Sequence, residues 1–146
     1  MVVQEESRTN RKCDSNILFK NKKHEAFYEE NLPKCRLQDV YHKALVYCLG
    51  ICEETRRYIN RIYDFNTGYV KTECLKEGWQ TGSSTKVTRI AFNLYCGGTP
   101  SVYDSEDMEE QLEECQSYAV DDLFCCGYAK YFWEAVKIRY PEYCRI

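Results

Sequence analysis

Three arginines and one asparagine close together in the chain are the residues best suited to nucleic-acid chemistry. They are Arg56, Arg57, Asn60 and Arg61. Guanidinium and amide groups can reach phosphates and base edges. The residues just before them, Leu49-Gly50-Ile51, have the glycine and the aliphatic side chain of a helix-turn-helix corner. The segment is therefore a candidate recognition helix of a DNA- or RNA-binding regulator.

Other features of the same segment favour a plain helical corner. Arg56 stands where a helix-turn-helix usually has an inward aliphatic residue, and Val46 stands where its first helix usually has a small one. The net charge of −3 also opposes nonspecific attraction to DNA. Nucleic-acid binding is therefore kept as the alternative hypothesis.

A run of carboxylates lies between Asp104 and Glu114. The candidate contacts for a protein partner are Glu106, Asp107, Glu109, Glu110, Glu113 and Glu114. Carboxylates along a helix can imitate a ladder of phosphates and occupy the basic groove of a nucleic-acid-handling protein. A solvated helix face is the simpler interpretation of most charge runs. We expect this helix to begin at Asp104 or Ser105 and to bury one stripe, formed by Met108, Leu112 and Cys115.

The ten cysteines have two interpretations. Cys48 and Cys52 are spaced by one helical turn, and in a chain without an export signal reduced thiols that act as small core hydrophobes are favoured. Zinc is the alternative, but no cysteine pair has the two-residue gap of a zinc knuckle, and only His24 and His42 could complete a site. We therefore expect no metal and no cofactor, and keep redox or metal sensing through Cys48 and Cys52 as a further hypothesis.

Three other features could in principle support catalysis or ligand binding. The segment 78–86 is rich in glycine and hydroxyl groups ahead of a helix, but it misses the phosphate-loop pattern, so we interpret it as a structural cap. A cysteine paired with His42 could form a nucleophile and base, but no local pattern brings them together. His24 lies on an apolar helix face and is interpreted as a satisfied core histidine. We expect a protein that is not an enzyme.

Apolar periodicity and breaker residues predict a mainly α fold, a compact single-domain bundle of about six short helices. A small hairpin near residues 65–70 is left open, because Gly68 follows a turn-forming Asp-Phe-Asn-Thr stretch. The helices are expected over residues 21–31, 37–49, 53–64, 84–97, 105–115, 120–126 and 130–140, with a helical turn at 72–77. Asn21 is expected to cap the helix that it begins and Ser117 the helix 120–126, and Ile59 and Ile62 are expected to be buried.

The segment 78–97 is expected to contain the central helix, capped by Ser83 or Ser84 and ended by a left-handed Gly97. Its predicted inner residues are Val87, Ile90, Ala91 and Leu94. Elsewhere, Leu37, Tyr41, Tyr58 and Trp133 are predicted to face the core, and Arg56 to face solvent.

Residues 1–16 are predicted to be a polar, mobile lead-in, and residues 17–146 a single helical domain. No apolar run follows the N-terminal charges and no stretch reaches the roughly 18 apolar residues of a membrane span, so a cytoplasmic protein is expected. Residues 98–146 carry four Lys and Arg against eleven Asp and Glu, a net charge of −7, whereas residues 1–97 carry +4. The acidic C-terminal part suits a basic partner, although two such halves can also attract each other.

Several stretches taken together resemble a known family. They are residues 24–28 (HEAFY), 38–45 (QDVYHKAL), 49–51 with 55–57, 78–83 (GWQTGS), 89–95 (RIAFNLY) and 139–144 (RYPEYC). The chain resembles a small uncharacterised family of Firmicutes, often carried by phages, plasmids and conjugative elements, over roughly residues 19–144. This resemblance implies no activity and no site residue. It implies a context of mobile elements, whose small accessory proteins often regulate transcription or block host defence.

The expected function is therefore a non-enzymatic accessory protein that binds a host or element-encoded protein, and an inhibitor of a host-defence protein in particular. The acidic helix is the expected contact surface. The alternative is the helix-turn-helix regulator, and only this alternative expects DNA as a partner. The oligomeric state is left open.

Overall fold

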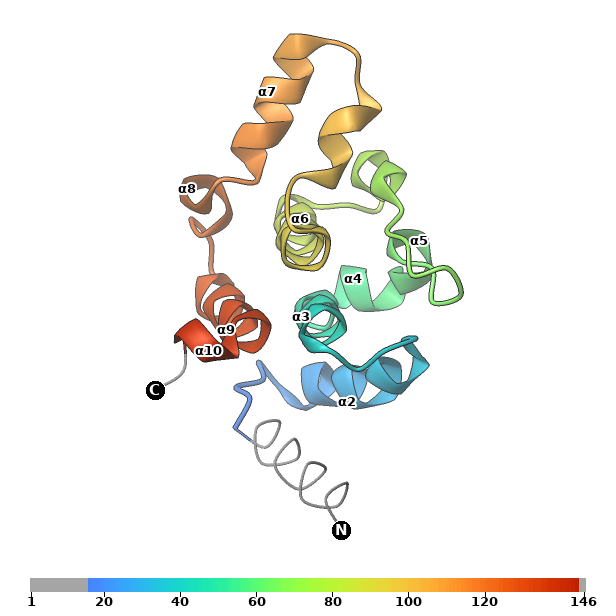
Figure 1. The fold of residues 1–146 in the computed structure, drawn as a ribbon, viewed down its shortest axis with the longest axis vertical. Coiled ribbons are helices and arrows are strands. Elements are labelled where there is room, and N and C mark those ends of the chain that lie inside the picture. Colours follow the sequence, from blue (N-terminus) through green and yellow to red (C-terminus); the bar gives the residue numbers. More distant parts are fainter. Residues whose placement is uncertain (1–15, 145–146) are drawn as a thin grey trace.

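The structure, a computed structural model, describes residues 16–144, and α3 (Val40–Leu49) lies at its centre. All six side chains from Ala44 to Leu49 are fully excluded from solvent. A helix that is buried all round belongs in the middle of a core. Figure 1 shows α3 surrounded by α2 (Lys22–Asn31), α6 (Gly82–Cys96) and α9 (Ala129–Arg139). The mainly α, single-domain prediction is confirmed for the described residues, and the predicted lead-in falls almost wholly outside them.

A reciprocal capping box starts α6, the helix that makes the most contacts with α3. The backbone N–H of Ser84 donates to Thr81 Oγ1 over 3.0 Å, and the N–H of Thr81 donates to Ser84 Oγ over 2.7 Å. The cap residue is thus Thr81, and the predicted cap at Ser83 or Ser84 is wrong by two or three residues. Gly97 ends α6 at φ 76° in the left-handed region, as expected. The predicted inner residues of α6 are all buried.

The corner between α2 and α3 is held by His24. The side chain of Asn21 caps α2 by accepting the N–H of His24, as expected. His24 is fully buried, its Nδ1 accepts the backbone N–H of Lys20 over 3.1 Å, and its Nε2 donates to the carbonyl of Tyr47 over 2.7 Å. The prediction of a satisfied core histidine is confirmed.

Gly50 ends α3 without adopting a left-handed conformation, because its φ is −81°. A Cβ atom at this position would lie 2.7 Å from His24 Cδ2 and 2.9 Å from Phe27 Cδ1. Real Cβ atoms do not approach other atoms so closely. Glycine is therefore required here by the close approach of α2 and not by backbone strain.

Helix α3 begins three residues later than predicted, after the cap residue Asp39. Leu37 lies before the helix and is 59% exposed, and Tyr41 is 42% exposed, so the prediction that both face the core is wrong. Tyr41 instead lies under a cation, since the Arg139 guanidinium is 3.7 Å from the centre of its ring. The 3₁₀ turn η1 (Leu32–Lys34) separates α2 from this loop.

The single helix predicted over residues 53–64 is two short helices, α4 (Glu53–Arg57) and α5 (Ile59–Ile62). The break falls at Tyr58, which is only half-buried and stacks on Trp79 with ring centres 4.6 Å apart. Ile59 and Ile62 are buried beyond it, as expected. The hairpin left open near residues 65–70 is reduced to one antiparallel bridge between Tyr63 and Val70, with Gly68 at φ 76° in the turn.

The C-terminal part differs most from expectation. The predicted turn η2 (Thr72–Lys76) is present, but the acidic helix is α7 (Met108–Ser117) and begins three to four residues late. Ser117 is the last residue of α7 and does not cap α8 (Val120–Leu123), which ends three residues early. Trp133 of α9 is 50% exposed, so its predicted inward position is wrong.

Pro141 begins a last short helix, α10 (Pro141–Cys144), because proline is tolerated in a first turn. No helix within residues 16–144 has the length and apolar character needed to span a membrane.

Candidate protein-contact site

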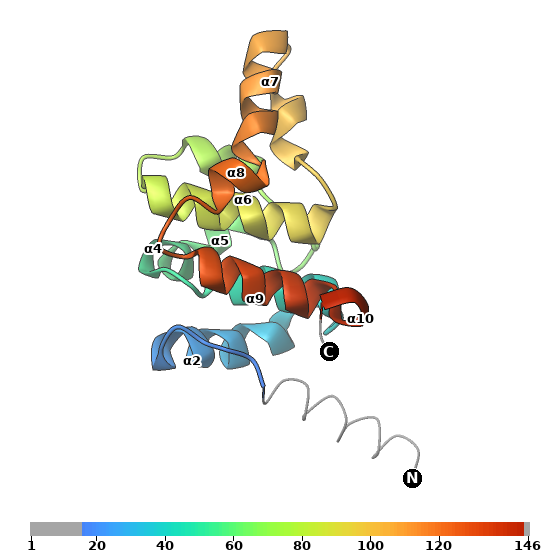
Figure 2. The same ribbon diagram turned by 90° about the vertical axis from the view of Figure 1, so that its left-hand side faces the viewer.

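An acidic arm projects from the helical body. We define it as residues 100–117, which contain the 3₁₀ turn η3 (Pro100–Asp104) and α7. Both views show these two elements side by side and extending away from the layer formed by α3, α6 and α9 (Figures 1 and 2). No residue of α7 is buried. The arm therefore presents most of its surface to solvent.

Local sequence explains why α7 forms there. Asp107 caps the helix, and its carboxylate accepts the backbone N–H of Glu109 over 2.9 Å. Glu109 and Glu110 stand in the first turn, where negative charge interacts favourably with the helix dipole. The side chain of Gln111 reaches back to donate to the carbonyl of Ser105 over 2.6 Å. These contacts start the helix and fix its direction relative to the preceding loop.

A polar network joins the arm to the central helix. Arg89 of α6 donates from Nε and Nη2 to the two carboxylate oxygens of Glu114, each over 3.2 Å. Ser101 donates to Glu114 over 2.7 Å, and its hydroxyl lies 2.8 Å from that of Tyr118. Tyr118 is buried, and burial raises the pKa of its hydroxyl to about 12, so it stays protonated. The network sets which face of α7 turns toward the body.

The six carboxylates predicted as protein contacts fall into two groups. Glu114 is turned inward and is only partly exposed because it binds Arg89 and Ser101. The other five are exposed to solvent. Two of these have local partners, since Asp107 is the helix cap and Glu110 accepts the hydroxyl of Ser105. The carboxylates free for a partner by geometry are Glu106, Glu109 and Glu113.

The stripe predicted to be buried on this helix is exposed. Met108 is 73% exposed, Leu112 is 58% exposed, and Cys115 is also exposed. These residues are spaced by four and three positions, which places them on one face of the helix. The face turned toward the body carries Gln111 and Glu114 instead. The prediction of a buried stripe is wrong because polar contacts orient α7.

At 100° per residue, the exposed stripe runs beside an exposed acidic stripe formed by Glu109 and Glu113, with Gln116 between them. An apolar stripe bordered by carboxylates is the pattern of an amphipathic helix that docks into a groove on another protein. Sequence reasoning missed these apolar contacts. A usable signal was Gln111, Glu114 and Tyr118, which share a different face of the helix at spacings of three and four residues.

The structure distributes the four nucleic-acid candidates over two helices. Arg56 and Arg57 belong to α4, whereas Asn60 and Arg61 belong to α5, after the break at Tyr58. Arg56 is half-buried, against the prediction of an exposed side chain, because it donates to the carbonyl of Gly50 over 2.9 Å.

The remaining three candidates also have partners within the chain. Arg57 pairs with Glu53 over 3.2 Å, and Arg61 makes an ion pair with Glu77, the residue that follows η2. The backbone carbonyl of Asn60 accepts a hydrogen bond from Lys71. Because the helix breaks at Tyr58, the four residues do not form one continuous helical face.

Cys48 and Cys52, the candidates for sensing, are both buried, and burial raises the pKa of each thiol. A thiol with a raised pKa is a poor nucleophile and a poor metal ligand. Across residues 16–144, no three His, Cys, Asp or Glu side chains gather in a way that could hold a metal ion. In this part of the chain every cysteine is a free thiol.

Fold and surface together define a small helical protein with a projecting acidic arm. The chain matches, over residues 14–146, the model of a family of unknown function, DUF6075. It therefore belongs to that family. The search of curated proteins and the search of solved structures each found no match.

Proposed function

We propose that the protein is a non-enzymatic binding protein whose acidic arm docks into a basic, partly apolar groove of another protein. The observation that carries this proposal is the exposed stripe of Met108, Leu112 and Cys115 beside the carboxylates of Glu109 and Glu113, on a helix with no buried residue. Apolar contacts would supply most of the affinity. The carboxylates would select a basic partner and speed association at low salt.

Charge and exposure point to a partner that handles nucleic acid. Residues 98–129 contain nine Asp and Glu residues and no Lys or Arg. A negatively charged surface is attracted to a basic groove that binds the phosphates of a nucleic acid. An acidic helix can occupy that groove in place of the nucleic acid. The resemblance to proteins of mobile elements in Firmicutes supports a host-defence nuclease as the target, with inhibition as the outcome.

The test is capture of partners from a nuclease-treated lysate of the host bacterium. The wild-type protein is compared with Glu109→Lys/Glu113→Lys, which reverses two arm carboxylates. The matched control is Glu25→Lys/Glu29→Lys, which makes the same i, i+4 reversal on exposed positions of α2. We expect a protein with nucleic-acid-processing activity to be retained by the wild type and the control, and lost by the arm variant. Retention by the arm variant would refute the proposal.

The alternative proposal, a helix-turn-helix regulator, rests on the α3–α4 corner and the exposed guanidinium groups of Arg57 and Arg61. Under this alternative, the affinity for DNA should fall steeply as the salt concentration rises. It should also weaken when these two arginines are replaced by alanine. Electrophoretic mobility shifts at low ionic strength test it. Absence of any wild-type complex would eliminate this alternative and leave the arm proposal standing.

A further inference from the structure

A histidine–aspartate pair lies at the N-terminus of α3, away from the acidic arm. Asp39 is the cap residue, and its Oδ1 accepts both the backbone N–H of His42 over 3.0 Å and the ring Nδ1–H of His42 over 2.6 Å. Burial alone would raise the pKa of the Asp39 carboxyl, but the hydrogen bonds from His42 outweigh burial and lower it. Asp39 is therefore a carboxylate that keeps a proton on Nδ1 of His42.

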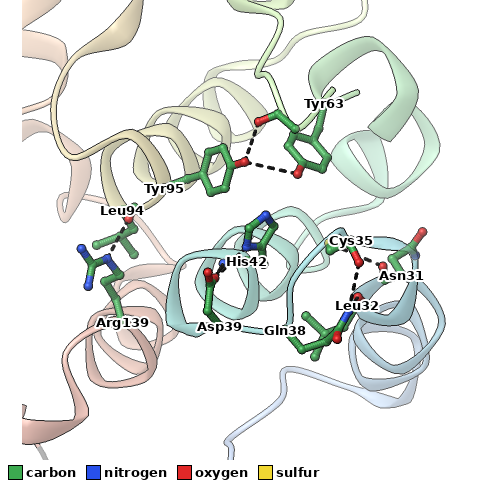
Figure 3. Close-up of polar contacts among 11 residues, drawn as sticks. Asn31, Leu32, Cys35, Gln38, Asp39, His42, Tyr63, Leu94, Tyr95 and Arg139 are labelled. Carbon is green, nitrogen blue, oxygen red and sulfur yellow. Dashed lines mark hydrogen bonds and ion pairs between the residues drawn. The ribbon is translucent and has the colours of Figure 1, made fainter. Parts of the chain in front are cut away.

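The other ring nitrogen of His42, Nε2, has no hydrogen-bond partner among the described residues. The side chain of His42 is only 10% exposed, but Nε2 is not among the buried polar atoms that lack a partner, so it reaches solvent. His42 lines a cavity of about 390 Å³, together with Arg36, Leu37, Thr67, Gly68 and Tyr95. Figure 3 shows the imidazole lying between Asp39 and the tyrosine pair of Tyr63 and Tyr95. The cap uses only the backbone N–H of His42 and its Nδ1–H, so Nε2 is an acceptor at this cavity that the cap does not use.

The cavity wall also provides a cation, Arg36, whereas the hydroxyl of Tyr95 and the nearby thiol of Cys35 are already hydrogen-bonded. The guanidinium of Arg36 makes only one hydrogen bond to a described residue, at 3.4 Å to the carbonyl of Thr67. The hydroxyl of Tyr95 is engaged with the carbonyl of Gly68 over 2.5 Å. Cys35 is close to Asp39, but burial and that carboxylate raise the pKa of its thiol to about 11, and the thiol donates to the carbonyl of Asn31. Among residues 16–144, Cys35 therefore does not supply a thiolate nucleophile beside His42.

A ligand for this cavity must meet two requirements. With Nδ1–H held by Asp39, neutral His42 offers a lone pair on Nε2 and needs a hydrogen-bond donor. Arg36 needs an anionic acceptor, preferably one with several oxygens. A phosphate group close to its second pKa of about 6 meets both, because its monoanion carries an O–H as well as charged oxygens.

We propose that the cavity at His42 and Arg36 binds a small phosphate-bearing molecule. One phosphate O–H donates to Nε2 of His42, and the remaining oxygens accept hydrogen bonds from Arg36. The exposed side chain of Leu37 borders the cavity and can cover an apolar part of the ligand.

The test is nitrogen NMR of the imidazole rings in titrations with inorganic phosphate and, at equal ionic strength, with sulfate. The chain has only two histidines, so His24, with both nitrogens hydrogen-bonded inside the core, is an internal control. We expect phosphate to shift the Nε2 signal of His42 saturably, while His24 does not move. Sulfate, which has no O–H to donate, should bind much more weakly. Equal shifts with both anions would overturn the proposal.

The variant Arg36→Gln removes the positive charge of Arg36 and keeps a polar side chain at the same exposed position. Loss of a charge-assisted hydrogen bond should weaken phosphate about tenfold. Arg57→Gln, on an exposed arginine outside the cavity, is the matched control and should leave the titration unchanged. An unchanged phosphate affinity in Arg36→Gln would contradict the proposed geometry, and unchanged amide spectra would show that the variant remains folded. The phosphate titrations do not involve the acidic arm, so their outcome is independent of the function proposed for the arm.

Discussion

Arg89 and Glu114 join the central helix to the acidic arm through two parallel hydrogen bonds of 3.2 Å each. Their side chains are only 19% and 24% exposed, so the pair is partly shielded from water. A bidentate guanidinium–carboxylate contact fixes orientation as well as distance. This contact turns the carboxylate of Glu114 toward the body and leaves Met108 and Leu112 facing solvent.

Removing the charge of Glu114 should therefore loosen the arm. In Glu114→Gln we expect the free energy of unfolding to fall by about 1–2 kcal/mol, because a charge-assisted network is weakened at a partly buried site. Hydrogen exchange should accelerate in α7 and remain slow in α3. Glu113→Gln, an exposed neighbour, is the control and should change stability by no more than about 0.5 kcal/mol. Equal effects of the two variants would contradict the anchoring role of Glu114.

The exposed stripe gives a second prediction, which separates binding from folding. Leu112→Ser should leave the free energy of unfolding within about 0.5 kcal/mol of wild type, because Leu112 is 58% exposed. Leu94→Ala, in the buried face of α6, should cost about 2–5 kcal/mol. Urea denaturation measures both. If Leu112→Ser were as destabilising as Leu94→Ala, the stripe would be packed in solution and could not serve as the contact surface.

A third prediction concerns the α2–α3 corner. Gly50→Ala should destabilise the protein by about 1–3 kcal/mol, because the new methyl group would meet the rings of His24 and Phe27 at less than 3 Å. Gly127→Ala is the matched control, since no atom lies within 4 Å of its added Cβ and its φ is negative. Thermal unfolding of the two variants makes the comparison. A Gly50→Ala protein as stable as the control would show that α2 can move away from α3.

Local signals predicted those parts of the fold that local interactions determine. Asn21 was recognised as the cap of α2 and Gly97 as the end of α6, because caps depend on residues within one turn. The break at Tyr58 was missed because its ring stacks on Trp79, a contact between residues that are 21 positions apart. The apolar periodicity of residues 53–64 continues through Tyr58 and contains no information about its contact with Trp79.

The candidate site was predicted in part for the same reason. The carboxylates of the arm are evident from composition, but the orientation of α7 depends on Arg89, which lies 25 residues before Glu114. Apolar periodicity predicts the wrong inner face for α7, because a partly buried polar network decides that face. The position of the His42 Nε2 was likewise beyond sequence reasoning, because it depends on how residues 36–37, 67–68 and 95 come together around one open cavity.

His24 should make the stability depend on pH. Burial lowers the pKa of His24 from 6.5 to about 4, against the hydrogen bond to Tyr47, which raises it. Between these values the unfolded chain binds a proton that the folded chain does not, so the free energy of unfolding falls as the pH decreases. The contribution of His24 is fully present above pH 6.5, and about 3 kcal/mol is lost by pH 4.

The measurement is urea denaturation of the wild type and of His24→Gln across this pH range. Gln keeps an amide that can donate toward the carbonyl of Tyr47, but it does not titrate. We expect His24→Gln to be the less stable protein at neutral pH, because it loses the contact with the N–H of Lys20. The stability difference should shrink by about 3 kcal/mol as the pH falls to 4, since carboxylates common to both proteins cancel. Parallel pH profiles would show that His24 accepts a proton as readily in the folded chain as in the unfolded one, and would contradict the burial of the ring and the use of Nδ1 as an acceptor for the N–H of Lys20.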